Sequence, residues 1–356
     1  MALPSSWEDI LPLRQGAAHR SDRSSFRSYL VEIRPQIEER LLLHLLARDA
    51  KAELGKDLMA LLMGGKRLRG GLTMLIFDSF SDGKGDRTLA LDLAAAIELA
   101  HASSLVLDDI IDEDETRRGA RAIHILEGEK RAILRMVAAI SLPYTIASSH
   151  GDAFVAPLAE VQRRMARGAL AEMAGTPFPT MADYERVITL KTGELFGLAA
   201  YYGAVVAGCG PELAARITRF GLEVGKVMQM ADDIADLRKA FFGACHVSRG
   251  SEMMLLNTVI PVHLANDIEG DLKARRLTSV RAKLQEAMGP DWFDLELKGH
   301  LATELRKITI IANDLWSCEP APNSQGRPFP EMRRIIEAVP SEIAILLFEE
   351  LDSQYP

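Results

Sequence analysis

The amino-acid sequence predicts a single all-α domain, on three observations. Apolar residues recur at spacings of three and four along most of the chain, among abundant Ala, Leu, Met and Glu. Alternating runs of β-branched residues, which strands would need, are nearly absent. No shift in composition marks a domain boundary, and 356 residues with 48% hydrophobic content can bury one substantial core. We therefore expect helices packed on helices throughout.

Turn-forming residues divide the chain into its predicted helices. Gly, Pro and small polar residues gather at 64–65, 81–85, 175–179, 209–211 and 319–328. The periodic segments expected to be helical are 37–63, 68–80, 88–113, 130–147, 153–174, 182–207, 211–242 and 252–266. Residues 1–24 are rich in Ser and Arg and weakly periodic, so we expect a partly ordered arm there. The helical domain then comprises 25–356, with 319–328 as a loop inside it.

Composition and charge exclude several classes of protein. The net charge of −8 argues against binding to nucleic acid, although it allows a local basic pocket for an anionic small substrate. Cys209, Cys245 and Cys318 are too widely spaced for a zinc or disulfide framework, which fits a reducing cytoplasm best. Residues 1–25 lack a secretory signal, and the apolar run 136–148 is shorter than the ~20 residues that span a bilayer. We expect a soluble cytoplasmic protein without a transmembrane segment.

Two aspartate clusters of the same form lie in separate apolar, helix-patterned segments. Their carboxylates are Asp108, Asp109 and Asp112 in the first cluster and Asp232, Asp233 and Asp236 in the second. Burying each charge costs several kcal/mol unless a partner neutralises it, so a cation is expected between the clusters. In a helix the first and last carboxylates of each cluster share a face, about one turn (~5.4 Å) apart. Such paired oxygens suit Mg²⁺, which completes its shell with water and substrate phosphates, so the implied substrate is a pyrophosphate.

Basic residues close to these clusters could bind anions. Lys66 and Arg69 are three residues apart where a helix is expected to begin, so both can point toward the free amides of its first turn. Arg117 and Arg118 follow the first cluster, and adjacent side chains on a helix point about 100° apart, toward two different anions. His101 lies two turns before that cluster, at the height of a ligand entering between helices. The alternatives are a solvated basic turn and a histidine satisfied in the core or at the surface.

Taken in order, these motifs resemble those of the trans-isoprenyl diphosphate synthases, the polyprenyl synthetase family that includes farnesyl and geranylgeranyl diphosphate synthases. The matching residues, within 60–265, are Gly65-Lys66-Arg67-Leu68-Arg69, His101, Asp108-Asp109-x-x-Asp112, Arg117-Arg118-Gly119, Lys191-Thr192-Gly193 and Gln229-x-x-Asp232-Asp233-x-x-Asp236. The resemblance implies the isoprenoid synthase type I fold, a bundle of long antiparallel helices around a deep central cavity with the two clusters facing each other at its mouth. It also implies a homodimer.

The resemblance further implies a role for each matching residue. The direct ligands of three Mg²⁺ ions would be Asp108, Asp112 and Asp232, while Asp109, Asp233 and Asp236 would ligate or hold the surrounding waters. The allylic diphosphate would be held by Arg117, Lys191 and Gln229. The second substrate, isopentenyl diphosphate, would be held by Gly65, Lys66, Arg69, His101 and Arg118. Mg²⁺ would help the allylic C–O bond to ionise, and the released pyrophosphate could remove the final proton. Thr192 and the carbonyl of Lys191, where we expect a distorted helix, could stabilise cationic charge.

The allylic side departs from the family pattern. Relatives carry two lysines after the second cluster, and the corresponding positions here fall near His246 and on Asn257. Losing such cations should weaken substrate binding or slow ionisation, because charge-assisted contacts are worth about 1.5–3 kcal/mol each. Arg249, Arg238 or Lys239 could compensate. Glu172 stands where relatives carry Asp or Gln, and Ala169 replaces the neighbouring polar residue.

Residues before the first cluster predict product length. A growing prenyl chain would extend down the cavity past Ser104, Ser103 and Ala100, which lie one to two turns before Asp108 at about 1.5 Å per residue. Short-chain relatives have bulky aromatic residues at the first two positions, whereas small residues here leave the cavity open. Close helix packing, which also favours Ala and Ser, is the alternative explanation. We expect a product of C20 or longer, with C20 the main one.

Three functions are consistent with these residues. The first is elongation: a Mg²⁺-dependent prenyltransferase that condenses isopentenyl diphosphate with an allylic diphosphate. The second is a non-elongating class I terpene synthase-like enzyme, which would not need Lys66, Arg69, His101 and Arg118. The third is a non-catalytic subunit of a heteromeric prenyltransferase, which could lose the aspartates. Because both sets of residues are intact, we favour the elongating enzyme.

Overall fold

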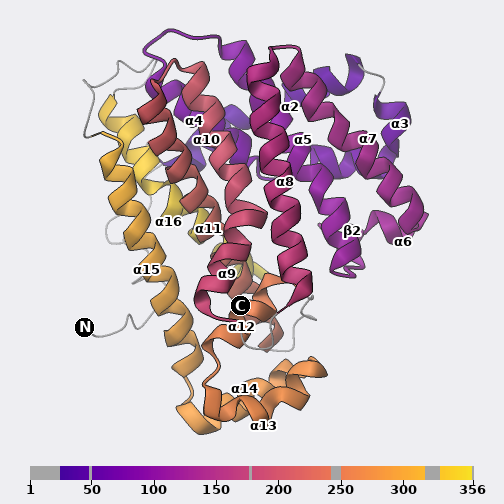
Figure 1. The fold of residues 1–356 in the computed structure, drawn as a ribbon, viewed down its shortest axis with the longest axis vertical. Helices are drawn as coiled ribbons and strands as arrows, with labels where there is room; N and C mark the ends of the chain where they lie inside the picture. Colours follow the sequence, from indigo (N-terminus) through magenta and orange to yellow (C-terminus); the bar gives the residue numbers. More distant parts are fainter. Residues whose placement is uncertain (1–24, 48–49, 176–178, 242–249, 317–328, 355–356) are drawn as a thin grey trace.

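A computed structural model of the chain describes residues 25–47, 50–175, 179–241, 250–316 and 329–354 (Figure 1). These residues form an all-α bundle of long helices, as the sequence predicts. The helices are α2 (Phe26–Ala47), α3 (Ala50–Met63), α4 (Leu68–Phe80), α5 (Arg87–Ile111), α6 (Ile123–Glu127), α7 (Glu129–Ser148), α8 (Asp152–Ala174), α9 (Met181–Ile188), the π-helical turn η2 (Thr189–Gly193), α10 (Glu194–Val206), α11 (Pro211–Phe241), α12 (Ser251–Val259), α13 (Val262–Lys273), α14 (Leu277–Met288), α15 (Trp292–Asp314) and α16 (Phe329–Gln354). A short antiparallel hairpin of β1 (Thr116–Arg117) and β2 (Ala120–Arg121) follows α5.

The centre of the bundle is α10, which packs closely against α4 and against α11. Almost all of α4 is buried and α10 is apolar on all sides, as expected for helices surrounded by others. Glycines permit the closest approaches: a Cβ on Gly203 of α10 would lie 2.4 Å from the carbonyl oxygen of Thr73 in α4. On α11, a Cβ on Gly221 would lie 2.6 Å from the carbonyl oxygen of Phe196. This centre positions α5 and α11, the two helices that carry the aspartate clusters.

Helix boundaries differ from the predicted ones in two places. The segment predicted as one helix over 37–63 begins earlier, at Phe26, and is divided between α2 and α3. The predicted segment 252–266 is divided at Pro261, because proline lacks an amide hydrogen and drives the preceding Ile260 to an extended conformation. Three further helices, α14, α15 and α16, lie beyond the last predicted segment. The arm over 1–24 and the loop over 319–328 lie outside the described residues.

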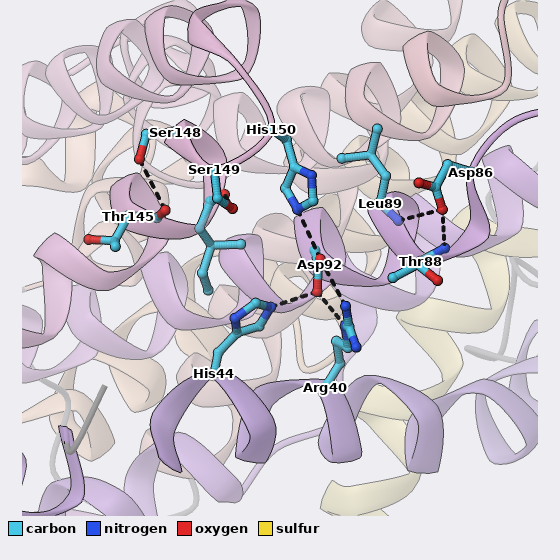
Figure 2. Close-up of polar contacts among 11 residues, drawn as sticks. Arg40, His44, Asp86, Thr88, Leu89, Asp92, Thr145, Ser148, Ser149 and His150 are labelled. Carbon is cyan, nitrogen blue, oxygen red and sulfur yellow. Dashed lines mark hydrogen bonds and ion pairs between the residues drawn. The ribbon is translucent and has the colours of Figure 1, made fainter. Parts of the chain in front are cut away.

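The end of α5 remote from the aspartate cluster is held by a buried ion-pair cluster (Figure 2). Asp92 of α5 is 3% exposed and accepts hydrogen bonds from Arg40 of α2 through Nε and, at 3.1 Å, through Nη2. The Nε2 atoms of His44 and His150 lie 2.6 and 2.9 Å from its two carboxylate oxygens. Burial alone would raise the pKa of Asp92, but the hydrogen bonds from His44 and Arg40 hold it well below the usual range. Through these contacts, α2 and His150, which follows α7, are held against α5.

One described helix, α5, is long and apolar enough to cross a bilayer. Its apolar window has a mean hydropathy of 1.5, and 72% of that window is buried inside the protein. A core helix of a folded domain has the same properties, so α5 is weak evidence for a membrane span.

Candidate active site

A cavity of about 770 Å³ lies between α4, α5, α7, α8 and α11 and the start of α12. Its polar part is lined by both acidic and basic groups, among them Asp108, Asp112, Asp232, Asp236, Lys66 and Arg117. Its apolar part is lined by Ala100, Leu105, Met136, Ile140, Met165 and Ala166. Charged groups and an apolar shaft therefore belong to one cavity, which suits a ligand with an anionic head and a hydrocarbon tail.

The first and last aspartates of each cluster face this cavity, as the helix spacing predicts. Asp108 and Asp112 line it from the end of α5, and Asp232 and Asp236 line it from α11. Asp109, by contrast, is 2% exposed and accepts a 2.6 Å hydrogen bond from Nε of Arg117. The α5 cluster thus divides into two cavity-facing carboxylates and one that holds a neighbouring cation.

Asp233 is the counterpart of Asp109 on α11. Its carboxylate accepts hydrogen bonds from the Tyr184 hydroxyl at 2.7 Å, from Nε2 of Gln229 at 2.9 Å and from the Ser251 hydroxyl at 2.9 Å. Burial, and then the neighbouring Glu252, raise the pKa of Asp233 well above its usual value. Asp233 borders the cavity, but these three protein partners engage the carboxylate that was predicted to ligate a metal ion or hold water.

Asp108 and Asp232, the first aspartates of the two clusters, both have raised pKa values, which a bound cation would lower. Burial raises the pKa of Asp108 to about 6, with Lys191 opposing the shift and Asp112 adding to it. Burial, and then Asp236, raise the pKa of Asp232 to about 6. Within the described part of the chain, no three His, Cys, Asp or Glu side chains converge closely enough to hold a metal ion by themselves. The carboxylates therefore fit Mg²⁺ ions that take the rest of their ligands from water and substrate phosphates.

The basic residues predicted to hold isopentenyl diphosphate lie together at one side of the cavity. Gly65, Lys66, Arg69, His101 and Arg118 all line it. Arg69 is 7% exposed, its guanidinium lies 4.6 Å from the centre of the Phe196 ring, and its Nε has no hydrogen-bond partner. A buried donor without a partner is costly, and burial lowers the pKa of Arg69 to about 10. Such a group suits an anionic ligand.

His101 and Arg118 complete this basic side. Burial, and then the nearby charge of Arg69, lower the pKa of His101 well below its usual value, so its imidazole is neutral. Arg118 donates hydrogen bonds to the carbonyls of Gly64 and, at 2.9 Å, of Leu61, which places its guanidinium against the glycine turn before α4. Arg67 also lines the cavity, but it is 2% exposed, its Nη2 donates to the Leu62 carbonyl at 2.7 Å, and it lies 3.6 Å from the carboxylates of Glu38 and Glu98.

On the allylic side, the predicted cations already have carboxylate partners. Nζ of Lys191 donates to Oε2 of Glu172 at 2.7 Å, and Oε1 of that buried carboxylate has no partner. Burial alone would lower the pKa of Lys191, but Asp108 and Glu172 raise it above the usual value. Arg117 is bound to Asp109 and, at 2.9 Å, to Asp114.

The distortion predicted at the Lys-Thr pair is present as η2, where the amide of Glu194 donates to the carbonyl of Thr189. The Thr192 hydroxyl donates to Oε1 of Gln229 at 2.7 Å, and Nε2 of Gln229 donates to Asp233. Gln229 therefore links the π turn to the second cluster. Its side chain lines the cavity but is engaged at both ends.

The positions of the missing lysines lie away from the cavity or outside the described residues. Asn257 is on α12 and does not line the cavity, while His246 and Arg249 fall within 242–249, which the structure does not describe. Of the other two candidates for compensation, Lys239 donates to Asp236 at 2.9 Å, and Nε of Arg238 lies 3.9 Å from Asp294.

Several residues that line the cavity were missed from the sequence. Ser251 and Glu252 line it at the start of α12. Glu252 lies five residues before Asn257, and the family pattern has an Asp at that spacing before its second lysine. That spacing was a usable signal. Asp114 and Arg34 also line the cavity, and no sequence pattern singled them out.

Two of the three predicted product-length residues line the apolar shaft. Ala100 and Ser104 do so, whereas Ser103 does not. Ser103 is fully buried, and its hydroxyl donates to the Leu99 carbonyl at 2.7 Å. The interpretation of Ser103 as a shaft residue was therefore wrong: residues five apart on a helix point about 140° apart, and only the face of Ser104 and Asp108 meets the cavity.

Comparison with known proteins agrees with this geometry. The sequence profile of the polyprenyl synthetase family matches residues 52–241. A geranylfarnesyl diphosphate synthase of Aeropyrum pernix is 36% identical over 191 residues, which cover 51% of this chain and 60% of that protein. A short chain isoprenyl diphosphate synthase of Methanothermobacter thermautotrophicus is 33% identical over 181 residues, covering 49% of this chain and 55% of the relative. The matches thus span little more than half the length of these relatives.

Solved structures share the fold over a longer stretch. The crystal structure of a geranylgeranyl pyrophosphate synthase superposes with a TM-score of 0.65 at 20% identity, covering 90% of this chain and 98% of that one. Because the family profile matches more than half of the 356 residues and all its motifs meet in one cavity, this chain belongs to the polyprenyl synthetase family.

Proposed function

We propose that this protein is a Mg²⁺-dependent prenyltransferase that condenses isopentenyl diphosphate with an allylic diphosphate to give a longer trans-polyprenyl diphosphate. The carrying observation is the single cavity, which joins two pairs of carboxylates, a buried basic side and an apolar shaft. Each part matches one part of the reaction: the allylic diphosphate with its metal, the second diphosphate, and the growing chain.

Asp108, Asp112, Asp232 and Asp236 would hold the Mg²⁺ ions, and three ions is the number that the family resemblance implies. When bound, Mg²⁺ supplies Lewis-acid catalysis by drawing charge from the allylic diphosphate. Asp109 and Asp233 act as positioning residues: one orients Arg117, and the other orients Gln229 and thereby Thr192.

The remaining residues bind, orient and exclude water. Lys66, Arg69 and Arg118 hold the diphosphate of isopentenyl diphosphate, and neutral His101 adds a hydrogen bond without adding charge. The apolar shaft keeps water from the carbocation, and the Lys191 carbonyl within η2 would add dipolar stabilisation of the positive charge. Incubation of the purified protein with Mg²⁺, isopentenyl diphosphate and a series of allylic diphosphates, followed by product sizing, tests the activity.

The product is proposed to be C20 or longer, chiefly geranylgeranyl diphosphate. Small side chains at Ala100 and Ser104 leave the α5 side of the shaft open. Predominantly C10 or C15 product from the unmodified protein, measured by chromatography after dephosphorylation, would contradict this.

The assembly is proposed to be a homodimer. On α7, Ile133, Leu134 and Val137 are 41%, 69% and 53% exposed, and such clustered apolar side chains favour burial against a second copy. Light scattering coupled to size-exclusion chromatography measures the mass directly, and Leu134→Lys should shift it toward the monomer.

A second candidate function rests on the Glu172–Lys191 ion pair. A lysine already neutralised by a buried glutamate binds an allylic diphosphate less well, as in a subunit that supports a catalytic partner. The same incubation decides between them, because a non-catalytic subunit forms no product alone and a non-elongating enzyme consumes only the allylic substrate.

A further inference from the structure

The apolar shaft descends from the charged part of the cavity between α5, α7 and α8. On α8 its lining residues are Ala169, Ala166, Met165 and Gln162, close to one per turn below Glu172. Gln162 is ten residues from Glu172, or about 15 Å along the helix axis. Met136 and Ile140 face it from α7. On α5 it is lined by the small residues Ala100 and Ser104, and by Glu98 at a depth similar to that of Gln162.

Gln162 is the polar member of this otherwise apolar α8 face. Its Oε1 accepts a 2.5 Å hydrogen bond from the Tyr144 hydroxyl, and Tyr144 is one turn beyond Ile140 on α7. The pair therefore bridges α7 and α8 at the deep end of the shaft. The Nε2 atom of Gln162 is buried and has no hydrogen-bond partner, so the amide is tethered at one end only.

Further along α8, an aromatic contact joins this helix to α10. Phe154 is eight residues beyond Gln162 on α8, and its ring meets the ring of Tyr202 edge-on at 5.8 Å between centroids. Tyr202 is fully buried, and its hydroxyl donates to the Phe154 carbonyl at 2.5 Å. Beyond the Gln162–Tyr144 pair, there is thus a second barrier rather than open space.

We propose that the Gln162–Tyr144 pair is the floor of the prenyl cavity and sets the longest chain that the protein accommodates. The inference deepens the proposed function and rests on it. On α5, Ala100 and Ser104 are too small to close the shaft, and the carboxylate of Glu98 is held at α4, where it accepts a 2.8 Å hydrogen bond from the Gly70 amide. A chain that reached Gln162 would have to displace an amide that the Tyr144 hydroxyl holds in place, and its methyl groups offer that amide no hydrogen bond.

Two variants test separately whether the size of the Gln162 side chain or its hydrogen bond to Tyr144 limits the chain length. Gln162→Ala removes the floor, so the shaft extends to the Phe154–Tyr202 contact and the maximum chain grows by a bounded step. Tyr144→Phe keeps the ring but frees the amide to rotate, so a smaller shift in the same direction is expected. Gln162→Leu keeps a side chain of similar size but loses the hydrogen bond to Tyr144, so its shift should match that of Tyr144→Phe and stay below that of Gln162→Ala. Arg163→Ala, at the next residue with a 58% exposed side chain, is the matched control and should change nothing.

The readout is binding of unreactive allylic thiolodiphosphates from C10 to C25, measured by calorimetry with Mg²⁺, beside product sizing. In Gln162→Ala, the affinity for the first chain length that the unmodified protein rejects should rise roughly tenfold relative to C10, since each added isoprene unit buries several apolar carbons. Tyr144→Phe gives the same readout in a nearly isosteric variant if Gln162→Ala does not fold.

The outcomes for the floor and for the activity are distinguishable. Unchanged length preference in both Gln162→Ala and Tyr144→Phe, with normal binding of shorter chains, overturns the floor and leaves the prenyltransferase proposal standing. Binding that shifts with these variants while no product forms supports the floor and counts against catalysis. Failure of the unmodified protein to bind any chain length overturns both.

Discussion

The two ends of α5 place a buried aspartate in opposite electrostatic environments. Near its start, Asp92 is surrounded by Arg40, His44 and His150, and its pKa lies well below the usual range (Figure 2). Near its end, burial raises the pKa of Asp108 to about 6, because no cation of the protein compensates it fully. Asp92 and Asp108 lie about 24 Å apart along the axis of α5, at 1.5 Å per residue.

This difference shows where the protein supplies its own counter-charge and where it requires one from outside. A carboxylate with partners from two other segments stabilises the fold, whereas a buried carboxylate without a full counter-charge costs folding free energy. The second cluster differs, because burial raises the pKa of both Asp232 and Asp233, although Asp233 accepts hydrogen bonds from Tyr184 and Gln229. Function is therefore expected at Asp108 and Asp232, and stability at Asp92.

The largest expected effect is on turnover. Asp108→Ala and Asp232→Ala should each lower the rate by orders of magnitude, because neither acidic face alone surrounds the metal ions. Their unfolding free energy should be unchanged or raised, since each change removes an undercompensated buried charge. Steady-state kinetics and denaturant titration measure the two quantities, with Asp267→Ala, an exposed carboxylate on α13, as the control. Near-normal activity in either variant would remove the metal assignment.

Asp92→Asn should lower the stability of the fold and leave turnover nearly unchanged. Removing the charge leaves Arg40 without its carboxylate, and we expect a loss of about 2–3 kcal/mol in unfolding free energy, tempered by the partial exposure of Arg40. KM values for both diphosphates should change little. If urea titration shows equal stability for Asp92→Asn and the unmodified protein, the ion-pair cluster around Asp92 contributes nothing to the unfolding free energy.

The sequence predicted the functional aspartates at the end of α5 but not the ion-pair cluster around Asp92 near its start. Asp108 and Asp112 were recognisable because carboxylates repeat at helical spacing in an apolar segment, and the same spacing fixed which of them face the cavity. Asp92 gave no such signal, because its partners come from 40–44 and 150, and only folding brings those segments together. Ser103 shows the same limit on a smaller scale: a helix spacing places residues around an axis, but the neighbouring helices decide which face meets a cavity. The division near Pro261 was readable from the proline itself.

Cations also differ between the two ends, since Arg40 is bound to Asp92 while the Nε of Arg69 is unpartnered near Asp108. Arg69→Ala should raise the KM for isopentenyl diphosphate roughly 10- to 100-fold, as for the loss of one charge-assisted contact. The KM for the allylic substrate should stay within about threefold, because that diphosphate is held elsewhere. An unchanged KM for isopentenyl diphosphate would show that this basic side holds something else.

Lowering the pH should remove the contribution of Asp92, near the start of α5, to the stability of the fold. The folded-state pKa of Asp92 is depressed, so its contribution to stability is complete above the unfolded value of about 3.9 and is lost as the pH falls below it. The stability difference between the unmodified protein and Asp92→Asn should therefore shrink between pH 5 and pH 3. A constant difference over that range, measured by urea titration at each pH, would mean that the Asp92 carboxylate is not stabilised in the folded state.

The smallest expected effect is at Asn257, where relatives carry a lysine that would add counter-charge at the Asp232 end. Asn257 is five residues after Glu252 on α12, so the two side chains point about 140° apart, and only Glu252 lines the cavity. A lysine at this position would reach the diphosphate only through an extended side chain. Asn257→Lys should therefore lower the KM for the allylic substrate by less than about tenfold, below the full worth of a charge-assisted contact. Thr258→Lys on the same helix is the control for added charge. A larger drop in KM would show that α12 turns toward the cavity when substrate binds, and an equal drop in both variants would assign the effect to net charge.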